Sequence, residues 1–585
     1  MVSKAQLQDI PSESMILLVG PPGAGKSAFC EQTILKSIAM DRPVIYVTTE
    51  CGPPKAKAAL KERGLAEIEA GLLNFVDAYN ETVGLLVSDQ LDTVRADSVN
   101  LSSIGIAISK LQERIGKKGI LLVFDSLTSP YLLSGPEVVR FMRLTLSRFT
   151  AEGNSVLACF DEGAGKEEDH VAMMSLANGV IKIEASEDRQ VLSVVKHPRM
   201  RPTKVEVVIT ERIQELYNAN IWDPEILRKW FKSQKGFRES MQRFQANVFW
   251  PNFAFWSATL WDPKRFPTMT YDVWKNFAYL FRDMVSLLPW HMRLLFKLMM
   301  PKSVSNVKDA KKFFAGRLGR RHFEMRGDGI IEYLEDASNT DEHYVRVYES
   351  RECCGFENVG TAIACVLPPL LAGSFRGVEG IRGLEREWNA IETKCIGLGD
   401  PYCEFKLVAG EIPELRSSLE RDSAVVERIH HHMIRRVMEF LVDGKPLVER
   451  PRLGSDFVMG HPEISLPAMS SERYRMALRM GGAKSGREVG EQLMETGMGS
   501  DEAAKRFFSL VEYCKVGEIM ADETIKMKDS RESMYTNQLT KKWEEPSCYF
   551  LTGFFNGFFS AVKNQHVKEI KCIAMGDPYC EWEFR

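Results

Sequence analysis

The chain has 585 residues, of which 44% are hydrophobic and 26% charged, with a formal net charge of −3. This length predicts roughly three to five domains, and the near-neutral charge gives no reason to expect general affinity for nucleic acid. No apolar run reaches the ~18–20 residues of a membrane span, and the N-terminus lacks a secretory signal pattern. We therefore expect a cytoplasmic protein, whose twelve cysteines are thiols or metal ligands rather than disulfides.

The first ~210 residues alternate between strand-like and helix-like patterns. Short buried-type apolar runs, separated by helical stretches, occur at residues 15–19, 43–48, 120–124 and 155–160. This alternation predicts an α/β domain with a mostly parallel sheet and helices on both faces. Three further runs, at residues 180–184, 191–195 and 205–209, are spaced as antiparallel strands added at an edge would be.

A glycine-rich loop, Gly-Pro-Pro-Gly-Ala-Gly-Lys-Ser, lies between the first strand and the first helix. This pattern in this context predicts a phosphate-binding loop for ATP or a close relative. Its backbone amides would face the phosphates, Lys26 would neutralise the β and γ oxygens, and Ser27 would hold Mg²⁺. The predicted nucleotide-binding residues of the loop are Gly20, Gly23, Ala24, Gly25, Lys26 and Ser27.

Two other predicted strands end in carboxylates. Asp125, after the run Ile-Leu-Leu-Val-Phe, is placed to hold the Mg²⁺ shell. Glu50, after Val-Ile-Tyr-Val-Thr-Thr, is placed to orient or deprotonate the attacking water. The alternative for Glu50 is a structural surface acid.

The order of these motifs resembles the RecA/KaiC-like ATPases, and KaiC-like archaeal proteins most of all, over about residues 10–212. The resemblance implies a homo-oligomer, usually a hexamer, with ATP between neighbouring subunits. It also implies a Lys-x-Arg on a late strand that reaches the neighbour's γ-phosphate. Lys196 matches this lysine, but Pro198 stands where the arginine is expected, and Arg199 follows one position later. The family's paired Glu-Glu is Glu50-Cys51 here, so these departures bear on the rate of hydrolysis more than on binding.

Seven of the ten tryptophans lie between Trp222 and Trp290. We interpret this stretch as an aromatic-rich connector packed between domains. A peripheral membrane or partner surface is the alternative, but the aromatics show no single-face pattern.

An internal repeat dominates the C-terminal half. KCIGLGDPYCEFKL at 394–407 and KCIAMGDPYCEWEF at 571–584 share nine of fourteen positions at an offset of 177 residues. Identity this dense indicates two copies of one module. Between the copies, a predicted helical linker carries His430-His431-His432, which fits a solvated helix face better than a metal site.

Each copy offers three thiols and one carboxylate. Gly-Asp-Pro-Tyr turns would fold the two repeat cysteines together, a glutamate precedes the first of them by three residues, and another cysteine begins an apolar helix upstream. Such a set is a closed tetrahedral shell for a structural Zn²⁺, with buried free cysteines as the alternative. The predicted ligands are Cys365, Glu392, Cys395 and Cys403 in the first copy and Cys548, Glu569, Cys572 and Cys580 in the second.

These motifs resemble the 4-vinyl reductase domain family. The resemblance implies zinc on three cysteines and one glutamate, and an α/β fold with an antiparallel sheet around an apolar pocket for a small molecule. The separation of the helix cysteine from the glutamate differs between copies, at 27 and 21 residues, so Cys365 is the ligand least supported by the repeat. The chain shows no nicotinamide or flavin motif that would support a reductase.

The sequence thus predicts an α/β multidomain protein with ATPase domain 1–212, connector 213–269, first module 270–408, helical linker 409–449 and second module 450–585. The leading hypothesis is a regulatory ATPase coupled to sensing of a small apolar ligand, with a protein partner also open. The alternatives are an ATP-dependent assembly scaffold, a DNA recombinase, for which no separate DNA-binding domain is evident, and an enzyme of tetrapyrrole or hydrocarbon metabolism.

Overall fold

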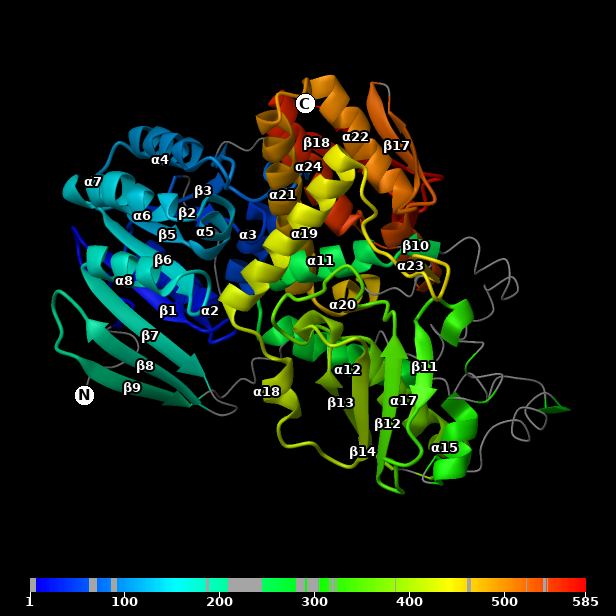
Figure 1. Cartoon of the computed structure of the whole chain (residues 1–585). Helices are drawn as coiled ribbons and strands as arrows, with labels where there is room; N and C mark the ends of the chain where they lie inside the picture. Colours follow the sequence, from blue (N-terminus) through cyan, green and yellow to red (C-terminus); the bar gives the residue numbers. More distant parts are fainter. Residues whose placement is uncertain are drawn as a thin grey trace.

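The computed structural model describes residues 7–62, 71–85, 92–185, 189–208, 245–279, 290–291 and 303–584, apart from 305, 315, 317–319, 321–322, 385, 460–463, 522, 540–542 and 544. The N-terminal domain forms one side of the molecule, and the two modules form the other (Figure 1). Trp222 and Trp230, predicted within the connector, lie outside the described residues.

A nine-stranded sheet forms the centre of the N-terminal domain, in the order β4-β3-β2-β5-β6-β1-β7-β8-β9. Its strands are β1 (Met15–Gly20), β2 (Val44–Thr48), β3 (Leu73–Asp77), β4 (Thr93–Arg95), β5 (Leu121–Phe124), β6 (Ser155–Asp161), β7 (Gly179–Ala185), β8 (Arg189–Lys196) and β9 (Thr203–Val208). The helices are α2 (Lys26–Ile38), α3 (Pro53–Glu62), α4 (Leu101–Ile115), α5 (Thr128–Ser134), α6 (Glu137–Phe141), α7 (Ser147–Ala151) and α8 (Glu167–Leu176).

Both faces of the central strands β1, β2, β5 and β6 are buried, which explains why these strands are continuous apolar runs. In β1, Met15, Leu17 and Val19 belong to one hydrophobic cluster. Ile16 and Leu18 belong to the cluster on the opposite face.

The mostly parallel sheet agrees with the sequence prediction, but its edges differ in two ways. β7 pairs parallel with β1, and only β8 and β9 are antiparallel to their neighbours. The sequence prediction treated all three as antiparallel and was wrong for β7. β3 and β4 were not predicted, and β4 has three residues, none of them buried, so it lacks a hydrophobic pattern.

The two modules share one strand order. The first sheet runs β11-β12-β14-β13 and the second β16-β17-β19-β18, with every neighbouring pair antiparallel. The first contains β11 (Ile330–Tyr333), β12 (Glu342–Tyr348), α17 (Leu367–Ile381), β13 (Trp388–Lys394) and β14 (Cys403–Ala409). The second contains β16 (Glu518–Ala521), β17 (Thr524–Lys528), α23 (Arg531–Leu539), α24 (Tyr549–Lys563), β18 (Val567–Lys571) and β19 (Cys580–Phe584). Matched order in both sheets supports the duplication inferred from the repeated motif.

The long helix of each module packs closely on a second helix from outside the sheet. α17 packs on α12 (Arg265–Tyr279), and α24 packs on α21 (Glu472–Glu495). A Cβ on Gly373 would collide with the carbonyl of Lys275, and a Cβ on Gly553 with that of Arg479. Because glycine has no side chain, the two helices of each pair can bring their backbones this close together.

One hydrophobic core joins the two modules. α11 (Phe249–Thr259) has ten buried residues, and its Trp250 and Phe253 rings meet Phe550 and Phe554 of α24 at centroid distances of 5.4–5.7 Å. In Figure 1, α11 lies between the modules. The remaining described elements of this half are β10 (Gln245–Asn247), α15 (Val307–Phe314), the short 3-10 helices η3 (Ile396–Leu398) and η4 (Ile573–Met575), α18 (Leu415–Leu419), α19 (Ser423–Asp443), β15 (Phe457–Met459), α20 (Ser465–Ser470) and α22 (Ser500–Tyr513). None of the helices among the described residues combines the length and apolar character that crossing a bilayer requires.

Candidate nucleotide site and cysteine clusters

The phosphate-binding loop connects β1 to α2 at the carboxyl edge of the parallel strands. Gly23 and Gly25 have φ values of +80° and +91°, a conformation that favours glycine. Gly25 lies at the N-terminal end of α2, and Ser27 is exposed in its first turn. The helix N-terminus and the loop amides form the type of site that binds phosphate.

Lys26 is held by oxygen atoms around the loop. Its Nζ donates to the carbonyls of Gly20 and Pro21, both at 2.7 Å, and pairs with Asp161 Oδ1 at 2.6 Å. Asp161 ends β6, the strand beside β1. Burial alone would raise the pKa of Asp161, but the charges of Lys26 and Arg473 outweigh it and hold this pKa below its ordinary value.

Asp125 and Glu50 follow neighbouring strands, β5 and β2, at the same edge. Thr49 donates its backbone N–H and its hydroxyl to Asp125 Oδ1 at 2.9 and 2.8 Å. Burial, and then the charge of Glu50, raises the pKa of Asp125 to about 7. Burial also raises the pKa of Glu50, against the opposing charges of Arg473 and Lys26. The structure thus gathers Lys26, Asp125 and Glu50 around one loop.

Lys196 lies away from the loop of its own chain. It ends β8 opposite Val180, at the start of β7, which is the amino edge of the parallel strands. Its Nζ donates to the carbonyl of Ser175 at 3.2 Å and is exposed. This placement excludes contact with the nucleotide of the same chain.

Two arginines that the sequence did not single out reach the loop from the C-terminal half. Arg265, the first residue of α12, donates from Nη2 to the carbonyl of Pro22 at 3.1 Å, and a Cβ on Gly23 would collide with its guanidinium. Arg473, in the first turn of α21, lies 3.4 Å (Nη2) from Asp161 Oδ2 and 3.2 Å (Nε) from Asp262 Oδ2. Local patterns do not reveal contacts between residues more than two hundred positions apart, so no signal in the single sequence marks them.

The first cysteine cluster contains Cys353, Glu392, Cys395 and Cys403, whose ligand atoms all lie within 4.8 Å of one another. Cys353 Sγ is 3.7 Å from Cys395 Sγ. We predicted Cys365 as the third thiol of this cluster, and this prediction is wrong, because Cys353 takes that place. Cys365 instead uses its backbone N–H to donate to Glu352 Oε1 at 2.7 Å.

The two cysteines lie at slightly different places before their helices. Cys365 lies two residues before α17 and donates its backbone N–H to Glu352, whereas Cys548 directly precedes α24 and belongs to its cluster. The triplet Ser-Arg-Glu, at 350–352 and again at 530–532, is the signal that could have located Cys353, which follows its first copy.

The second cluster contains Cys548, Glu569, Cys572 and Cys580, also within 4.8 Å. Here Ser533 follows the Ser-Arg-Glu triplet, and its Oγ lies 3.1 Å from Cys580 Sγ. Glu532 accepts the N–H groups of Phe550 and Leu551 at 3.1 and 3.2 Å, as Glu352 does at the start of α17. The third thiol thus comes from the triplet in one copy and from the helix start in the other.

Both clusters fit a divalent metal ion. Glu392 Oε1 and Glu569 Oε1 are buried and have no hydrogen-bond partner among the described residues, which is costly unless a cation balances them. Hydrogen bonds from Cys353 and Cys403 lower the pKa of Cys395 to about 3. Three thiols and one carboxylate at this separation are a suitable donor set for tetrahedral Zn²⁺.

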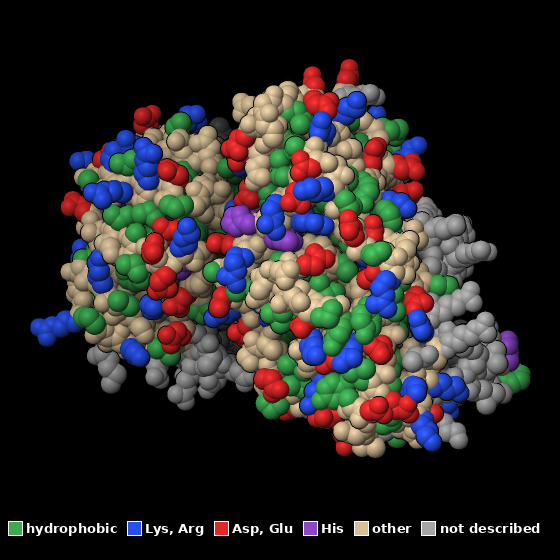
Figure 2. Space-filling view, in the orientation of Figure 1, with side chains coloured by type: hydrophobic (Ala, Val, Ile, Leu, Met, Phe, Trp, Pro, Cys, Tyr) green, Lys and Arg blue, Asp and Glu red, His purple; other side chains and the backbone are tan. Residues whose placement is uncertain are grey.

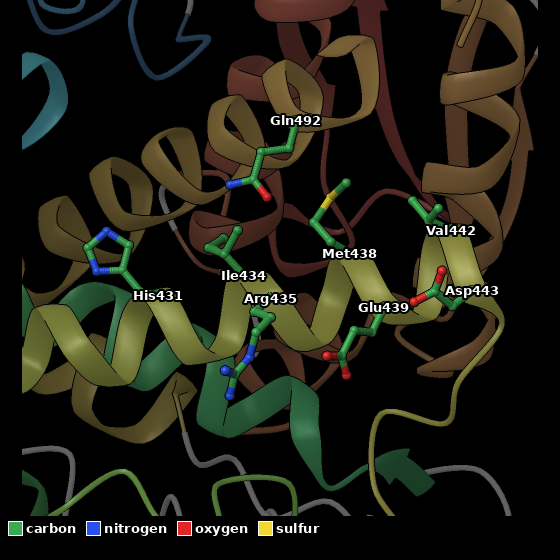
Figure 3. Close-up of a pocket in the computed structure, with 8 residues that line it drawn as sticks. All are labelled: His431, Ile434, Arg435, Met438, Glu439, Val442, Asp443 and Gln492. Atoms are coloured by element: carbon green, nitrogen blue, oxygen red, sulfur yellow. The ribbon is translucent and has the colours of Figure 1, made fainter. Parts of the chain in front are cut away.

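The predicted ligand pocket inside the modules is occupied by aromatic side chains. In the second module, the rings of Phe507 and Phe558 stack at a centroid distance of 3.8 Å. A groove occurs instead between α19 and α21 (Figure 3), and it is lined by His431, Ile434, Arg435, Met438, Glu439, Val442, Asp443 and Gln492. It combines the apolar side chains of Ile434, Met438 and Val442 with five polar or charged ones, so the groove alone does not indicate a class of ligand.

The histidine run is only partly solvated. His430 is buried, with Nε2 3.0 Å from Glu488 Oε2 of α21, and His432 Nε2 lies 2.9 Å from the carbonyl of Gly355. The run therefore links α19 to its neighbours instead of forming the solvated face that we predicted. The face of the molecule in Figure 2 shows basic and acidic side chains interspersed, without the extended basic patch typical of nucleic-acid binding.

Comparison with known proteins gives two family matches. The KaiC ATPase family matches residues 5–217, and the 4-vinyl reductase domain family matches residues 532–585. A UPF0273 protein of Pyrococcus furiosus is 31% identical over 146 residues, which is 24% of this chain and 57% of the relative. A UPF0273 protein of Methanopyrus kandleri is 28% identical over 145 residues, 24% of this chain and 56% of the relative.

The chain thus spans about half the length of these curated relatives. A crystal structure of a KaiC-like protein from Pyrococcus horikoshii aligns with 34% of this chain and 85% of its own, at 18% identity and a TM-score of 0.26. The chain carries a KaiC-like ATPase domain at its N-terminus and a 4-vinyl reductase domain near its C-terminus.

Proposed function

We propose that this protein hydrolyses ATP and that its two modules couple hydrolysis to the binding of a small apolar ligand. The observation that carries the proposal is the placement of Lys26, Asp125 and Glu50 around one phosphate-binding loop. Helices that pack on both modules, α12 and α21, begin at that loop, which gives a route for coupling.

In the proposed reaction, a water oxygen attacks the γ-phosphorus and the bond to the bridging oxygen breaks, leaving its electron pair on ADP. Glu50 orients the water and accepts its proton. Lys26 leaves its carbonyl partners to neutralise phosphate oxygens. Ser27 and Asp125 would hold Mg²⁺, which supplies charge neutralisation at the β and γ oxygens when bound.

The cysteine clusters would each hold a structural Zn²⁺. Both lie where the module's hairpin meets its long helix or the Ser-Arg-Glu turn, so a metal ion there would fix the sheet against the helix. The ligand class is argued from the aromatic interior: Phe375 and Trp388 meet at 5.1 Å in the first module, as Phe555 and Trp582 do at 5.0 Å in the second. Because these rings fill the interior of the modules, an apolar or aromatic molecule would bind there by displacing ring contacts with contacts of its own.

Steady-state ATP hydrolysis by the full chain tests the proposal. We expect Mg²⁺-dependent turnover that Lys26→Ala abolishes and that Glu50→Gln lowers by about 100-fold or more at unchanged ATP affinity. Phenol or toluene should change the turnover of the wild type. Turnover that survives Lys26→Ala would refute the ATPase assignment, and indifference to both aromatic probes would refute the coupling.

An ATP-dependent assembly scaffold is the second candidate. It is favoured by the position of Lys196, which could act only on a neighbouring subunit, and by Pro198 in place of the expected arginine. It predicts a hexamer that forms with ATP and turns over slowly. Particle mass measured with and without ATP, beside turnover, separates the two candidates. A recombinase is less favoured, because the face shown in Figure 2 has no extended basic patch.

A further inference from the structure

Two arginines lie at the phosphate-binding loop and come from the far half of the same chain. Arg265 is bonded to the loop carbonyl of Pro22, and its guanidinium occupies the space beside Gly23. Because the amides of such a loop enclose the phosphates of a bound nucleotide, a guanidinium bonded to the loop would lie near them.

Arg473 and Lys26 contact the same carboxylate, that of Asp161. Asp161 bridges the two, with Oδ1 toward Lys26 at 2.6 Å and Oδ2 toward Arg473 at 3.4 Å. Arg473 pairs with Asp161 and Asp262, yet 26% of its side-chain surface stays exposed. The exposed part of this side chain is available to a further acceptor, and ATP bound at the neighbouring loop would supply a phosphate oxygen.

These contacts belong to a broad junction that fixes α21 and α24 on the N-terminal domain. Asn556 donates to the carbonyl of Glu81 at 3.0 Å, and Arg479 donates to the hydroxyl of Tyr79 at 3.3 Å. Trp261 donates to Ser129 at 3.2 Å. The carboxyl edge of the sheet, where a neighbouring subunit would supply a residue, thus faces helices of its own chain.

The geometry points to Arg265 and Arg473 as phosphate-binding arginines that complete the ATP site within one chain, in place of a residue from a neighbouring subunit. One comes from the helix that packs on the first module and the other from the helix that packs on the second. A shift of either helix moves a positive charge at the γ-phosphate, so both modules control the same step. This inference rests on the proposed ATPase function.

The first test compares full-length variants. Arg473→Ala and Arg265→Ala should each lower kcat by about 100-fold or more and should weaken ATP binding more than ADP binding. Arg487→Ala is the matched control, because Arg487 also lies on α21 at the domain junction but pairs with Asp97, at 3.9 Å. Arg473→Lys keeps the charge beside Asp161 and Asp262; it should retain the wild-type melting temperature yet lose turnover.

The second test mixes two inactive proteins, Lys26→Ala and Arg473→Ala. If each chain completes its own site, the mixture stays inactive; recovery of activity would show that the arginine acts between chains and would overturn the inference. It would also be overturned if both arginine variants kept the kcat and ATP-over-ADP preference of Arg487→Ala. A wild type that neither binds nor hydrolyses ATP would instead refute the proposed function itself.

Discussion

The Sγ atom of Cys353 lies 3.7 Å from that of Cys395, whereas Cys365 is tied through its backbone to Glu352. Cys353→Ser should therefore remove one zinc equivalent per chain, because a hydroxyl is a poor ligand for Zn²⁺. Cys365→Ser, a substitution of the same size in the same module, should leave the zinc content unchanged. Metal analysis of the purified full chains checks this, and equal loss in both variants would refute the assignment.

The second cluster allows a rescue experiment. Ser533 follows the second copy of the Ser-Arg-Glu triplet, as Cys353 follows the first, and its hydroxyl lies 3.1 Å from Cys580 Sγ. We expect Cys548→Ser to lose the metal of this cluster and the double variant Cys548→Ser, Ser533→Cys to regain it. Metal content and melting temperature are the measurements; a double variant that stays metal-free would show that the two positions are not interchangeable.

Close packing of α21 on α24 predicts an unusual cost for a small substitution. Alanine is normally better than glycine within a helix by up to about 1 kcal/mol. At Gly553, however, the added methyl meets the carbonyl of Arg479, and overpacking of this kind costs roughly 1–3 kcal/mol.

Gly553→Ala should therefore lower the melting temperature of the full chain. Gly105→Ala is the control: it makes the same change within α4, where the nearest neighbour, the methyl group of Thr145, lies at an ordinary contact distance of 3.4 Å. An equal or higher melting temperature for Gly553→Ala would contradict the packing argument.

His343 predicts how stability depends on pH. It is buried between the Phe375 and Trp388 rings, its Nδ1 lies 2.7 Å from the hydroxyl of Tyr333, and burial and then the charge of Arg386, opposed by Asp341, lower its pKa to about 4. Because the folded-state pKa lies below the ordinary value near 6.5, the unfolded chain takes up the proton first.

The contribution of His343 is therefore complete above about pH 6.5 and is lost as the pH falls toward 4, by on the order of 2–3 kcal/mol. Melting temperatures between pH 7 and pH 4 should fall less steeply for His343→Gln than for the wild type. His291→Gln, which changes an exposed histidine, should keep the wild-type slope, and parallel slopes for all three proteins would refute the prediction.

The sequence was informative wherever a function depends on adjacent residues. The phosphate-binding loop and the central strands around Phe124 could be predicted because their patterns are local, and the repeat revealed the hairpin with Cys395 and Cys403. β4 could not be predicted, because its three residues bury no side chain fully. Arg265 and Arg473 were not predicted as site residues for another reason. Their contacts with the loop depend on how distant segments pack, and the spacing of residues along the chain does not encode this packing.

The hydrophobic core that the two modules share around α11 limits how such a chain can evolve. Each module covers apolar surface of the other and of α11, so deletion of one copy would leave the remaining copy with an exposed hydrophobic face. The duplication is therefore hard to reverse: the third thiol of a cluster can come from different segments, as Cys353 and Cys548 show, but loss of either copy would expose apolar surface of the other.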